Sequence, residues 1–340
     1  MTKSSTFDGT FDTIALIGVG LIGSSIARAI KKHKLARRVI GCDKDAETRR
    51  TIEALGLVDK AVVQAAKAVD DADLVIICTP VSTYAKIGAA ISRHLKEGSI
   101  LTDVGSVKGS VIRQLFPYLP IGVHFIPAHP VAGAEQSGPK LGFAEMFEDR
   151  WCIITPPPDV MISATIRLEA FWRRLGSRVA RMDPDHHDRV LAMTSHLPHL
   201  IAYAIVGTIF DLEREVSAKR GRSAPSPNMK IDRSEVIRFS AGGFRDFTRI
   251  AGSDPIMWRD IFLHNKDSVL EMLGRFIEDL LALQRAIRWG DGEMLQELFT
   301  QTREVRRGVV AAGQAGTFIP QEPQKGKNIQ YRQRSKKKRR

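Results

Sequence analysis

The sequence predicts an α/β protein in which a doubly wound, mostly parallel sheet is followed by an all-helical domain. In the first half of the chain, short and continuously apolar segments alternate with segments of helical periodicity. After Asp183 the strand signal ends and long helical patterns follow. Strands of a parallel sheet are covered on both faces and are therefore apolar throughout, and their alternation with helices is typical of a doubly wound sheet.

The expected strands all fall in the first half of the chain, with helices between them. They cover residues 13–18, 37–42, 73–79, 99–105, 123–129, 150–155 and 177–182. A length of 340 residues fits two domains. We expect a first domain at 12–183 and a helical domain at 184–316, with a flexible basic loop at 217–230 and a disordered basic tail at 317–340.

The net charge of +13 is concentrated in two segments. Residues 322–340 hold nine Lys or Arg and one Glu, and residues 216–233 hold five Lys or Arg and one Asp. Since the rest of the chain is close to neutral, we interpret these segments as solvated and mobile. A nucleic-acid partner is therefore not expected.

The composition is typical of a cytoplasmic protein. Hydrophobic residues make up 43% of the chain and charged residues 26%, which allows a sizeable core. Cys42, Cys78 and Cys152 lie in or beside apolar runs without metal-ligand spacing, so we expect reduced thiols and no metal. The N-terminus is polar, unlike a signal peptide, and the apolar runs are far shorter than the roughly 20 residues of a membrane span.

A dinucleotide-binding motif follows the first expected strand. It reads GVGLIG, from Gly18 to Gly23, and opens a helix. Gly18 allows the tight turn, Gly20 allows a pyrophosphate to approach the backbone, and Gly23 lets the helix pack closely on the strand. The N–H groups at the helix N-terminus, which include those of Leu21 and Ile22, would face the phosphates. This context predicts a Rossmann-type first domain.

Other cofactor contacts are expected at the ends of neighbouring strands. Asp43 ends the second expected strand, where a carboxylate can bind both ribose hydroxyls and repel a 2′-phosphate, which favours NAD over NADP. Asp43 can also be read as the N-cap of the next helix. Thr79 and Pro80 are expected to line the nicotinamide side of the cofactor. The alternative is an ordinary turn capped by Ser82.

Polar residues also gather at the ends of two further strands. Asp103, Ser106 and Lys108 lie at or just beyond the end of one strand, and His129 ends the next. We expect a hydroxyl and an imidazole at the same edge as the cofactor, with Asp103 among the cofactor contacts. A neutral imidazole can remove a hydroxyl proton near pH 7. The alternative for His129 is a polar residue that closes a strand.

The helical half contributes a second set of candidates. His196 and His199 are three residues apart on one helix face, and a later segment supplies Arg245, Arg249 and Trp258. A guanidinium can bind a carboxylate through two parallel hydrogen bonds. Each residue also has an ordinary explanation, as a hydrogen-bonded core histidine, an ion-paired arginine or a packed tryptophan.

Five motifs occur in a characteristic order: GVGLIG, DVGSVK, HPVAGAEQSG, SHLPH and GGFRDFTRIAGSDPIMW. With them the chain resembles the prephenate dehydrogenase family, specifically the short bacterial cyclohexadienyl (prephenate/arogenate) dehydrogenases, over roughly residues 12–312. The resemblance implies a dinucleotide domain, a helical domain that forms a homodimer, and an active site in the cleft between the two domains. It also implies NAD-dependent oxidative decarboxylation of prephenate to 4-hydroxyphenylpyruvate, of arogenate to tyrosine, or of both.

The resemblance also implies a role for each candidate. His129 matches the catalytic histidine, Ser106 matches the serine that hydrogen-bonds this histidine and the substrate hydroxyl, and Arg249 matches the arginine that binds the ring carboxylate. The family's substrate-side positions fall on His196, His199 and Trp258. The alternative function is that of another two-domain nicotinamide-dependent hydroxyacid dehydrogenase. One example, the β-hydroxyacid dehydrogenases, relies on a lysine of the helical domain, whereas here His129 and Arg249 are the candidates.

Overall fold

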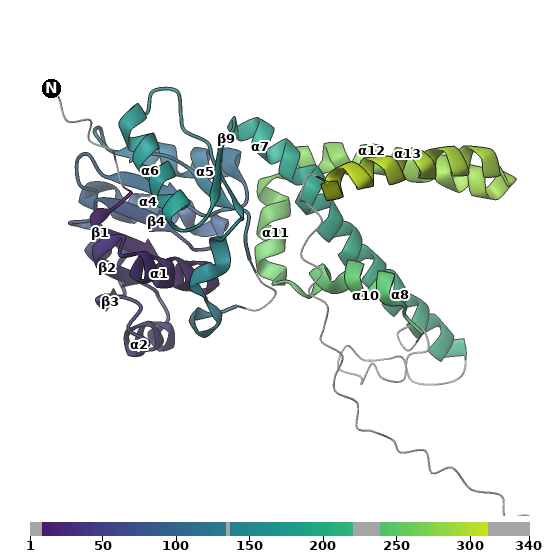
Figure 1. Cartoon of the computed structure of the whole chain (residues 1–340). Helices are drawn as coiled ribbons and strands as arrows, with labels where there is room; N and C mark the ends of the chain where they lie inside the picture. Colours follow the sequence, from purple (N-terminus) through teal and green to yellow (C-terminus); the bar gives the residue numbers. More distant parts are fainter. Residues whose placement is uncertain (1–8, 134–136, 220–238, 312–340) are drawn as a thin grey trace, which may run out of the picture. The chain divides into compact units, whose positions relative to one another are not determined.

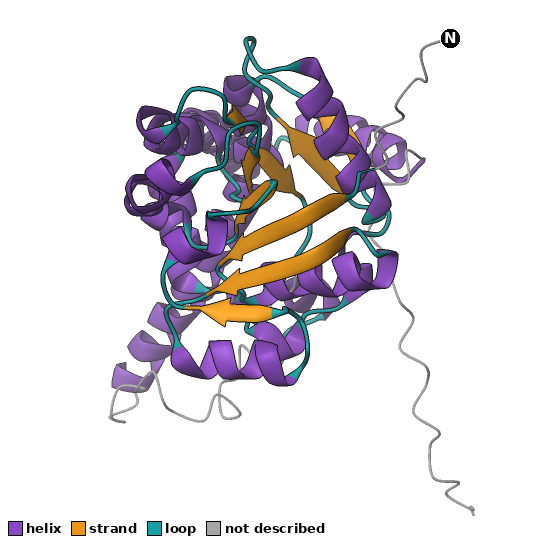
Figure 2. Ribbon diagram, turned by 90° about the vertical axis from the view of Figure 1, so that its left-hand side faces the viewer, coloured by secondary structure: helices purple, strands orange, loops and turns teal. Residues whose placement is uncertain are grey.

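The main sheet is parallel and has six strands in the order β3-β2-β1-β4-β5-β6. These strands are β1 (Phe11–Ile17), β2 (Ala36–Cys42), β3 (Lys60–Val62), β4 (Leu74–Ile77), β5 (Ile100–Asp103) and β6 (His124–Phe125). In the computed structural model, which describes residues 9–133, 137–219 and 239–311, helices lie on either side of this twisted sheet (Figure 2). The strand order reverses between β1 and β4, and sheets of this kind bind ligands beyond the carboxyl ends of their strands at that point.

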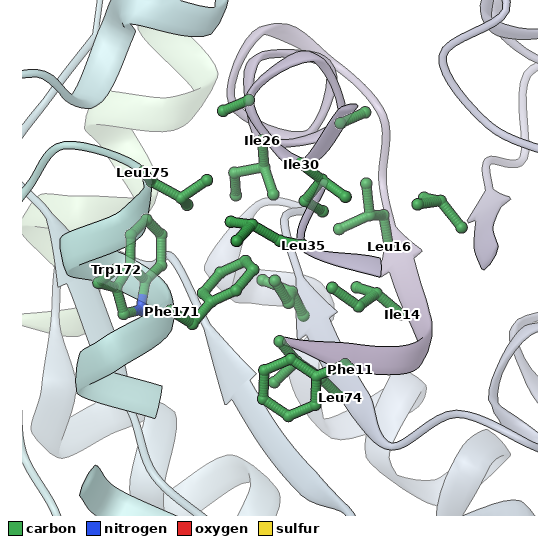
Figure 3. Packing of buried hydrophobic residues seen from close by; sticks show 14 of the residues in the cluster. Phe11, Ile14, Leu16, Ile26, Ile30, Leu35, Leu74, Phe171, Trp172 and Leu175 are labelled. Carbon is green, nitrogen blue, oxygen red and sulfur yellow. The ribbon is translucent and has the colours of Figure 1, made fainter. Parts of the chain in front are cut away.

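Alternate residues of each strand enter two separate cores, one on each face of the sheet. Ile14 and Leu16 pack in the core that contains α1 (Leu21–His33) and α6 (Ile162–Arg174). Ala15 and Ile17 pack in the opposite core. Figure 3 shows the first core, where the side chains of α6 and α1 meet above the strands. The predicted doubly wound fold is thereby confirmed, because only strands covered on both faces bury consecutive residues.

Short helices and turns connect the strands (Figure 1). They are α2 (Ala46–Ala54), α3 (Ala65–Val69), η1 (Val81–Thr83), α4 (Tyr84–Ile91), η2 (Ser92–His94), α5 (Lys108–Leu115), η3 (Phe116–Tyr118), η4 (Pro139–Leu141) and η5 (Ala144–Phe147). The short edge strand β3 was absent from the expected strands. Its three residues are too few to give a periodic signal.

The strand expected at 123–129 is in fact two strands in two sheets. β6 ends at Phe125, and β7 (Ala128–Pro130) pairs antiparallel with β8 (Trp151–Ile154), which pairs with β9 (Arg178–Arg181). The N–H groups of His124 and Ile126 donate to carbonyls in and just before β5, but the next N–H on that side, of Ala128, donates to the side chain of Asp103 instead, and the ladder ends there. The expectation that one strand of the main sheet carries His129 was therefore wrong.

The second half is helical, as predicted. Its elements are α7 (Pro184–Leu191), the π-helical turn η6 (Ala192–His196), α8 (Leu197–Lys219), α10 (Gly242–Thr248), η8 (Arg249–Gly252), α11 (Pro255–His264), α12 (Lys266–Trp289) and α13 (Gly292–Ala311). Asp183 caps α7 by accepting hydrogen bonds from two backbone N–H groups. By the contacts between its residues, the chain divides after Gly274 into two compact units.

The two predicted basic segments fall largely outside the described residues. α8 extends to Lys219, so the loop expected at 217–230 begins inside this helix, and its remainder is not described. The tail at 317–340 lies wholly outside. Of the described helices, the run Pro184–Leu212 is long and apolar enough to cross a membrane by length and composition, with a mean hydropathy of 1.4. The buried His187 and Asp188 lie within this run.

Candidate active site

The glycine turn after β1 has the geometry of a phosphate-binding loop. Gly18 has φ +87°, and a Cβ there would lie 2.6 Å from Cγ2 of Thr79. A Cβ on Gly23 would collide with the carbonyl oxygen of Gly18, whereas one on Gly20 would meet no atom within 4 Å. The N-terminus of α1 has no side-chain cap and no acidic residue in its first turn. Its N–H groups, with Leu21 and Ile22 half-buried beside them, are therefore suited to an anionic ligand.

Asp43 is held at the open edge of this turn. One carboxylate oxygen accepts a hydrogen bond from the N–H of Val19 at 3.0 Å, and the other accepts one from the N–H of Asp45 at 3.0 Å. Because a carboxylate has about four acceptor positions, it can still receive the two hydroxyls of a ribose. The reading of Asp43 as a helix cap was wrong, since Asp45 caps α2 by accepting from the N–H of Thr48 at 2.7 Å.

Thr79 and Pro80 follow β4, directly beside the glycine turn. The register pairs Ile17 of β1 with Ile77 of β4. Thr79 is half-buried and Pro80 is exposed, so both remain candidates for contact with a ligand. Ser82 does not cap the turn as its alternative reading required, because its hydroxyl donates to the carboxylate of Asp260 in α11 at 2.5 Å.

Asp103 is fully buried, and its carboxylate is engaged by protein groups. It accepts hydrogen bonds from Nζ of Lys108 at 2.6 Å and from the N–H groups of Gly105 at 2.7 Å and Ala128 at 3.1 Å. Lys108, also fully buried, donates in addition to the carbonyl of Ala128 at 2.6 Å. We therefore revise the expectation that Asp103 contacts the cofactor: the ion pair fixes the start of β7 to the end of β5.

This link places His129 at the carboxyl edge of the main sheet. Asp103 pairs in register with Ile77, which pairs with Ile17, so the ends of β5, β4 and β1 form one row. His129 follows Ala128, whose N–H is bonded to Asp103. Although β7 belongs to the second sheet, the imidazole thus arrives at the edge that the sequence predicted.

His129 is part of a chain of hydrogen bonds that the sequence reasoning missed. Its Nδ1 lies 2.9 Å from Nε2 of His187, and Nδ1 of His187 lies 2.8 Å from Oδ1 of Asp188. Asp188 also accepts the N–H groups of Lys108 at 2.7 Å and Gly109 at 2.9 Å, at the N-terminus of α5. All three linked side chains are buried. Adjacent His and Asp residues after the predicted boundary were the only sequence signal, and a single sequence does not show what they contact.

Burial lowers the pKa of His129 well below the ordinary value of 6.5, and the nearby His187, Lys108 and His196 lower it further. Burial also lowers the pKa of His187, although Asp188 opposes this shift. Burial raises the pKa of Asp188, but the hydrogen bonds from His187 and from α5 outweigh it, so that pKa is lowered overall. At neutral pH the cluster therefore consists of two neutral imidazoles and one carboxylate.

The predicted substrate-side residues form a second cluster. The ring of His199 stacks on Trp258 with centroids 3.6 Å apart, and the ring of His196 lies 6.0 Å from Trp258. Arg249, which is exposed, is close enough to His199 to lower its pKa, after the larger effect of burial. Nε2 of His196 and Nε1 of Trp258 are buried and have no hydrogen-bond partner among the described residues. Two buried nitrogens without a partner are suited to hydrogen-bond the oxygens of a bound ligand.

Ser106 lies in the loop between β5 and α5 and is half-buried. Within the described part of the chain its hydroxyl makes no hydrogen bond, so the expected contact with His129 stays a prediction. Arg245 is exposed on α10. No group of three His, Cys, Asp or Glu residues that could hold a metal occurs among the described residues.

Comparison with known proteins identifies two family models in the chain. Residues 26–181 match the model described as prephenate dehydrogenase, nucleotide-binding domain, and residues 183–301 match the one described as prephenate dehydrogenase, dimerization domain. The chain is 40% identical over 296 residues to a cyclohexadienyl dehydrogenase of Zymomonas mobilis, covering 87% of this chain and 95% of that protein. It is 34% identical over 299 residues to a prephenate dehydrogenase of Bacillus subtilis, covering 88% and 76%.

A solved structure agrees with these matches. The crystal structure of prephenate dehydrogenase from Aquifex aeolicus, in complex with hydroxyphenyl propionate and NAD+, superposes with a TM-score of 0.77 at 31% identity. The match covers 88% of this chain and 98% of that one.

Proposed function

The chain belongs to the prephenate dehydrogenase family, and we propose that it catalyses the NAD-dependent oxidative decarboxylation of prephenate, of arogenate or of both. The observation that carries this proposal is the place of His129. Its strand is bonded through Ala128 to the end of β5, in the row of strand ends that begins at the glycine turn. A buried, neutral imidazole at that edge is suited to remove the proton of a ring hydroxyl.

NAD fits the residues at the glycine turn. The open face at Gly20 and the uncapped N-terminus of α1 would hold the pyrophosphate, and the preset carboxylate of Asp43 would hold the ribose. Thr79 and Pro80 would border the nicotinamide. When bound there, the oxidised cofactor would supply the acceptor for the hydride of the ring carbon that bears the hydroxyl.

The chain's own residues would supply the remaining steps. His129 takes the hydroxyl proton, and Ser106 orients that hydroxyl. Arg249 binds the ring carboxylate through charge and hydrogen bonds, which are reversible. The carboxylate can therefore leave as CO₂ when the ring becomes aromatic. The unpartnered nitrogens of His196 and Trp258, with His199 stacked beside them, would bind further oxygens of the substrate.

We further propose that the helical part, residues 184–316, forms a homodimer of a cytoplasmic enzyme. In the unit after Gly274, α13 buries none of its described residues, and Phe299 and Val305 are 56% and 70% exposed. On α12, Ile287 and Trp289 are 67% and 77% exposed. Apolar faces of this extent are typical of helices that pack against a partner. Light scattering of the purified chain should give the mass of two chains; a monomer would contradict this proposal.

The activity is tested with purified protein, NAD+ and each substrate in turn, by following the absorbance of the reduced cofactor. We expect turnover with prephenate or arogenate, and His129→Asn should lower kcat by a factor on the order of 10³ with little change in NAD+ affinity. His186→Gln, an exposed neighbour of the cluster, should behave like the wild type. A lack of turnover with both substrates, or near-normal turnover of the His129 variant, would contradict the proposal.

A further inference from the structure

The hydrogen bonds around His129 have a definite direction, and we infer that Asp188 and His187 are positioning residues that hold His129 in the tautomer with a bare Nε2. This inference rests on the proposed function of His129 as the base. It adds two residues that neither the predicted site nor the family motifs contained.

The direction of these hydrogen bonds is set by backbone N–H groups, which can donate a hydrogen bond but cannot accept one. The backbone N–H groups of Lys108 and Gly109 can only donate, and both point at the carboxylate of Asp188. Asp188 is ionised and can only accept, so Nδ1 of His187, 2.8 Å away, must donate to it. Nε2 of His187 is then an acceptor, and Nδ1 of His129, 2.9 Å away, must donate to it. The proton of neutral His129 is therefore on Nδ1, and its Nε2 carries a lone pair.

This tautomer is the one that a general base requires. If Nε2 carried the proton, His129 could not accept one from a hydroxyl on its open side. When Nε2 takes the substrate proton, the Nδ1 proton of His129 can pass to Nε2 of His187. The N–H bond at His129 breaks as one forms at His187, and the positive charge then lies beside the carboxylate of Asp188.

Other charged groups around His129 do not replace this carboxylate. The ammonium of Lys108 is a like charge for an imidazolium, and the carboxylate of Asp103 is already paired with it. His196 is neutral, because burial lowers its pKa to about 4. Asp188 is thus the carboxylate that the imidazole chain reaches, and Nδ2 of Asn265 helps to fix it by donating to the carbonyl of Asp188 at 2.8 Å.

A purely structural role for Asp188, as the cap of α5, predicts different results from a positioning role. A cap would affect stability without affecting the tautomer of His129. α7 provides matched controls, since His186 and Asp185 are exposed neighbours of His187 and Asp188 on the same helix.

The first test observes the tautomer directly, without substrate or cofactor. In protein labelled with ¹⁵N in its histidine rings, long-range ¹H–¹⁵N spectra distinguish a protonated from a bare ring nitrogen. The chain has nine histidines, and the signal of His129 is assigned by its loss in His129→Asn. We expect a proton on Nδ1 and a bare Nε2. In Asp188→Asn the ionised acceptor that fixes the proton on Nδ1 of His187 is lost, so the Nδ1–H form of His129 is no longer enforced and its Nε2–H form should appear beside it. A wild-type His129 with its proton on Nε2 would overturn the inference.

The second test measures kinetics. Asp188→Asn should lower kcat by a factor on the order of 10² or more, as loss of a correctly protonated base does, while the Km for substrate and the Kd for NAD+ change little. Asp185→Asn should match the wild type. If Asp188→Asn does not fold, His187→Gln leaves the α5 cap in place and should show the same loss, with His186→Gln as its control.

The outcomes separate this inference from the proposed function. If the wild type lacks activity, the proposed function fails, but the tautomer measurement still decides the hydrogen-bond direction. If the wild type is active, and folded Asp188→Asn and His187→Gln retain its kcat and its pH profile, the positioning role is refuted.

Discussion

Nδ1 of His129 lies 2.9 Å from Nε2 of His187, although 58 positions separate the two residues in the sequence. His129 belongs to β7 and His187 to the first helix after the predicted domain boundary. The proposed base is therefore in contact with a residue from the other half of the chain. We expect activity to depend on the placement of α7 against α5, because Asp188 of α7 accepts the N–H groups at the N-terminus of α5.

The pH profile of the reaction should show the lowered pKa of His129. Burial holds this pKa well below 6.5, so the base stays unprotonated as the pH falls from 8 to 6.5 and loses its lone pair only at lower pH. We expect kcat/KM for the substrate to be level over that range and to decline below it. Steady-state rates across the pH range measure this limb, and assays returned to pH 7.5 control for acid unfolding. An acidic limb centred at 6.5 or above would contradict the burial argument.

The sequence was sufficient for most of the fold because local patterns determine it. The continuously apolar segments predicted five of the six strands of the main sheet, and α1 begins at Leu21, inside the glycine motif, as expected. The error at 123–129 came from a contact that is distant in sequence. The apolar run continues past the point where the N–H of Ala128 bonds the side chain of Asp103 instead of the backbone of β5, so the change of sheet was not visible in the pattern.

The site was only partly predictable because its contacts are non-local. Motifs located Gly18, Asp43 and His129 correctly at one edge of the sheet. The ion pair of Asp103 with Lys108 and the contact of His187 with His129 depend on which side chains meet after folding. A polar residue at a strand end can bind a ligand or a neighbour, and periodicity does not distinguish the two.

Asp43 should determine the choice between NAD and NADP. Asp43→Asn keeps the shape and one acceptor oxygen but removes the charge that would repel a 2′-phosphate. We expect the ratio of kcat/KM for NAD+ to that for NADP+ to fall at least tenfold, which corresponds to about 1.4 kcal/mol. Asp45→Ala is the control: loss of this cap should lower stability and leave the ratio unchanged. An unchanged ratio in Asp43→Asn would refute the ribose assignment.

Lys108 should be important for stability, because its removal leaves a buried charge. Lys108→Met deprives the fully buried carboxylate of Asp103 of its counter-ion, and breaking such a pair costs about 3–5 kcal/mol. Urea unfolding measures the loss. The double variant Lys108→Met, Asp103→Asn should recover part of it by removing the charge. As a control, Lys32→Met breaks exposed ion pairs with Glu145 and Glu148 and should have little effect on the free energy of unfolding, because solvent screens such pairs. Equal losses for the two lysines would contradict the prediction.

Arg249 should act on substrate binding more than on turnover. Burial is the main cause of the lowered pKa of His199, and the charge of Arg249 is near enough to lower it further. A guanidinium bonded to a carboxylate contributes about 1.5–3 kcal/mol. Arg249→Ala should therefore raise the substrate KM by about tenfold to a hundredfold, while the Kd for NAD+ stays the same.

Arg249→Lys should recover only part of the affinity, because lysine keeps the charge but not the two parallel hydrogen bonds. Arg245→Ala removes another exposed guanidinium, from the preceding helix. If it raises KM as much as Arg249→Ala does, the effect comes from the general positive charge of this segment, and the assignment of the ring carboxylate to Arg249 is wrong.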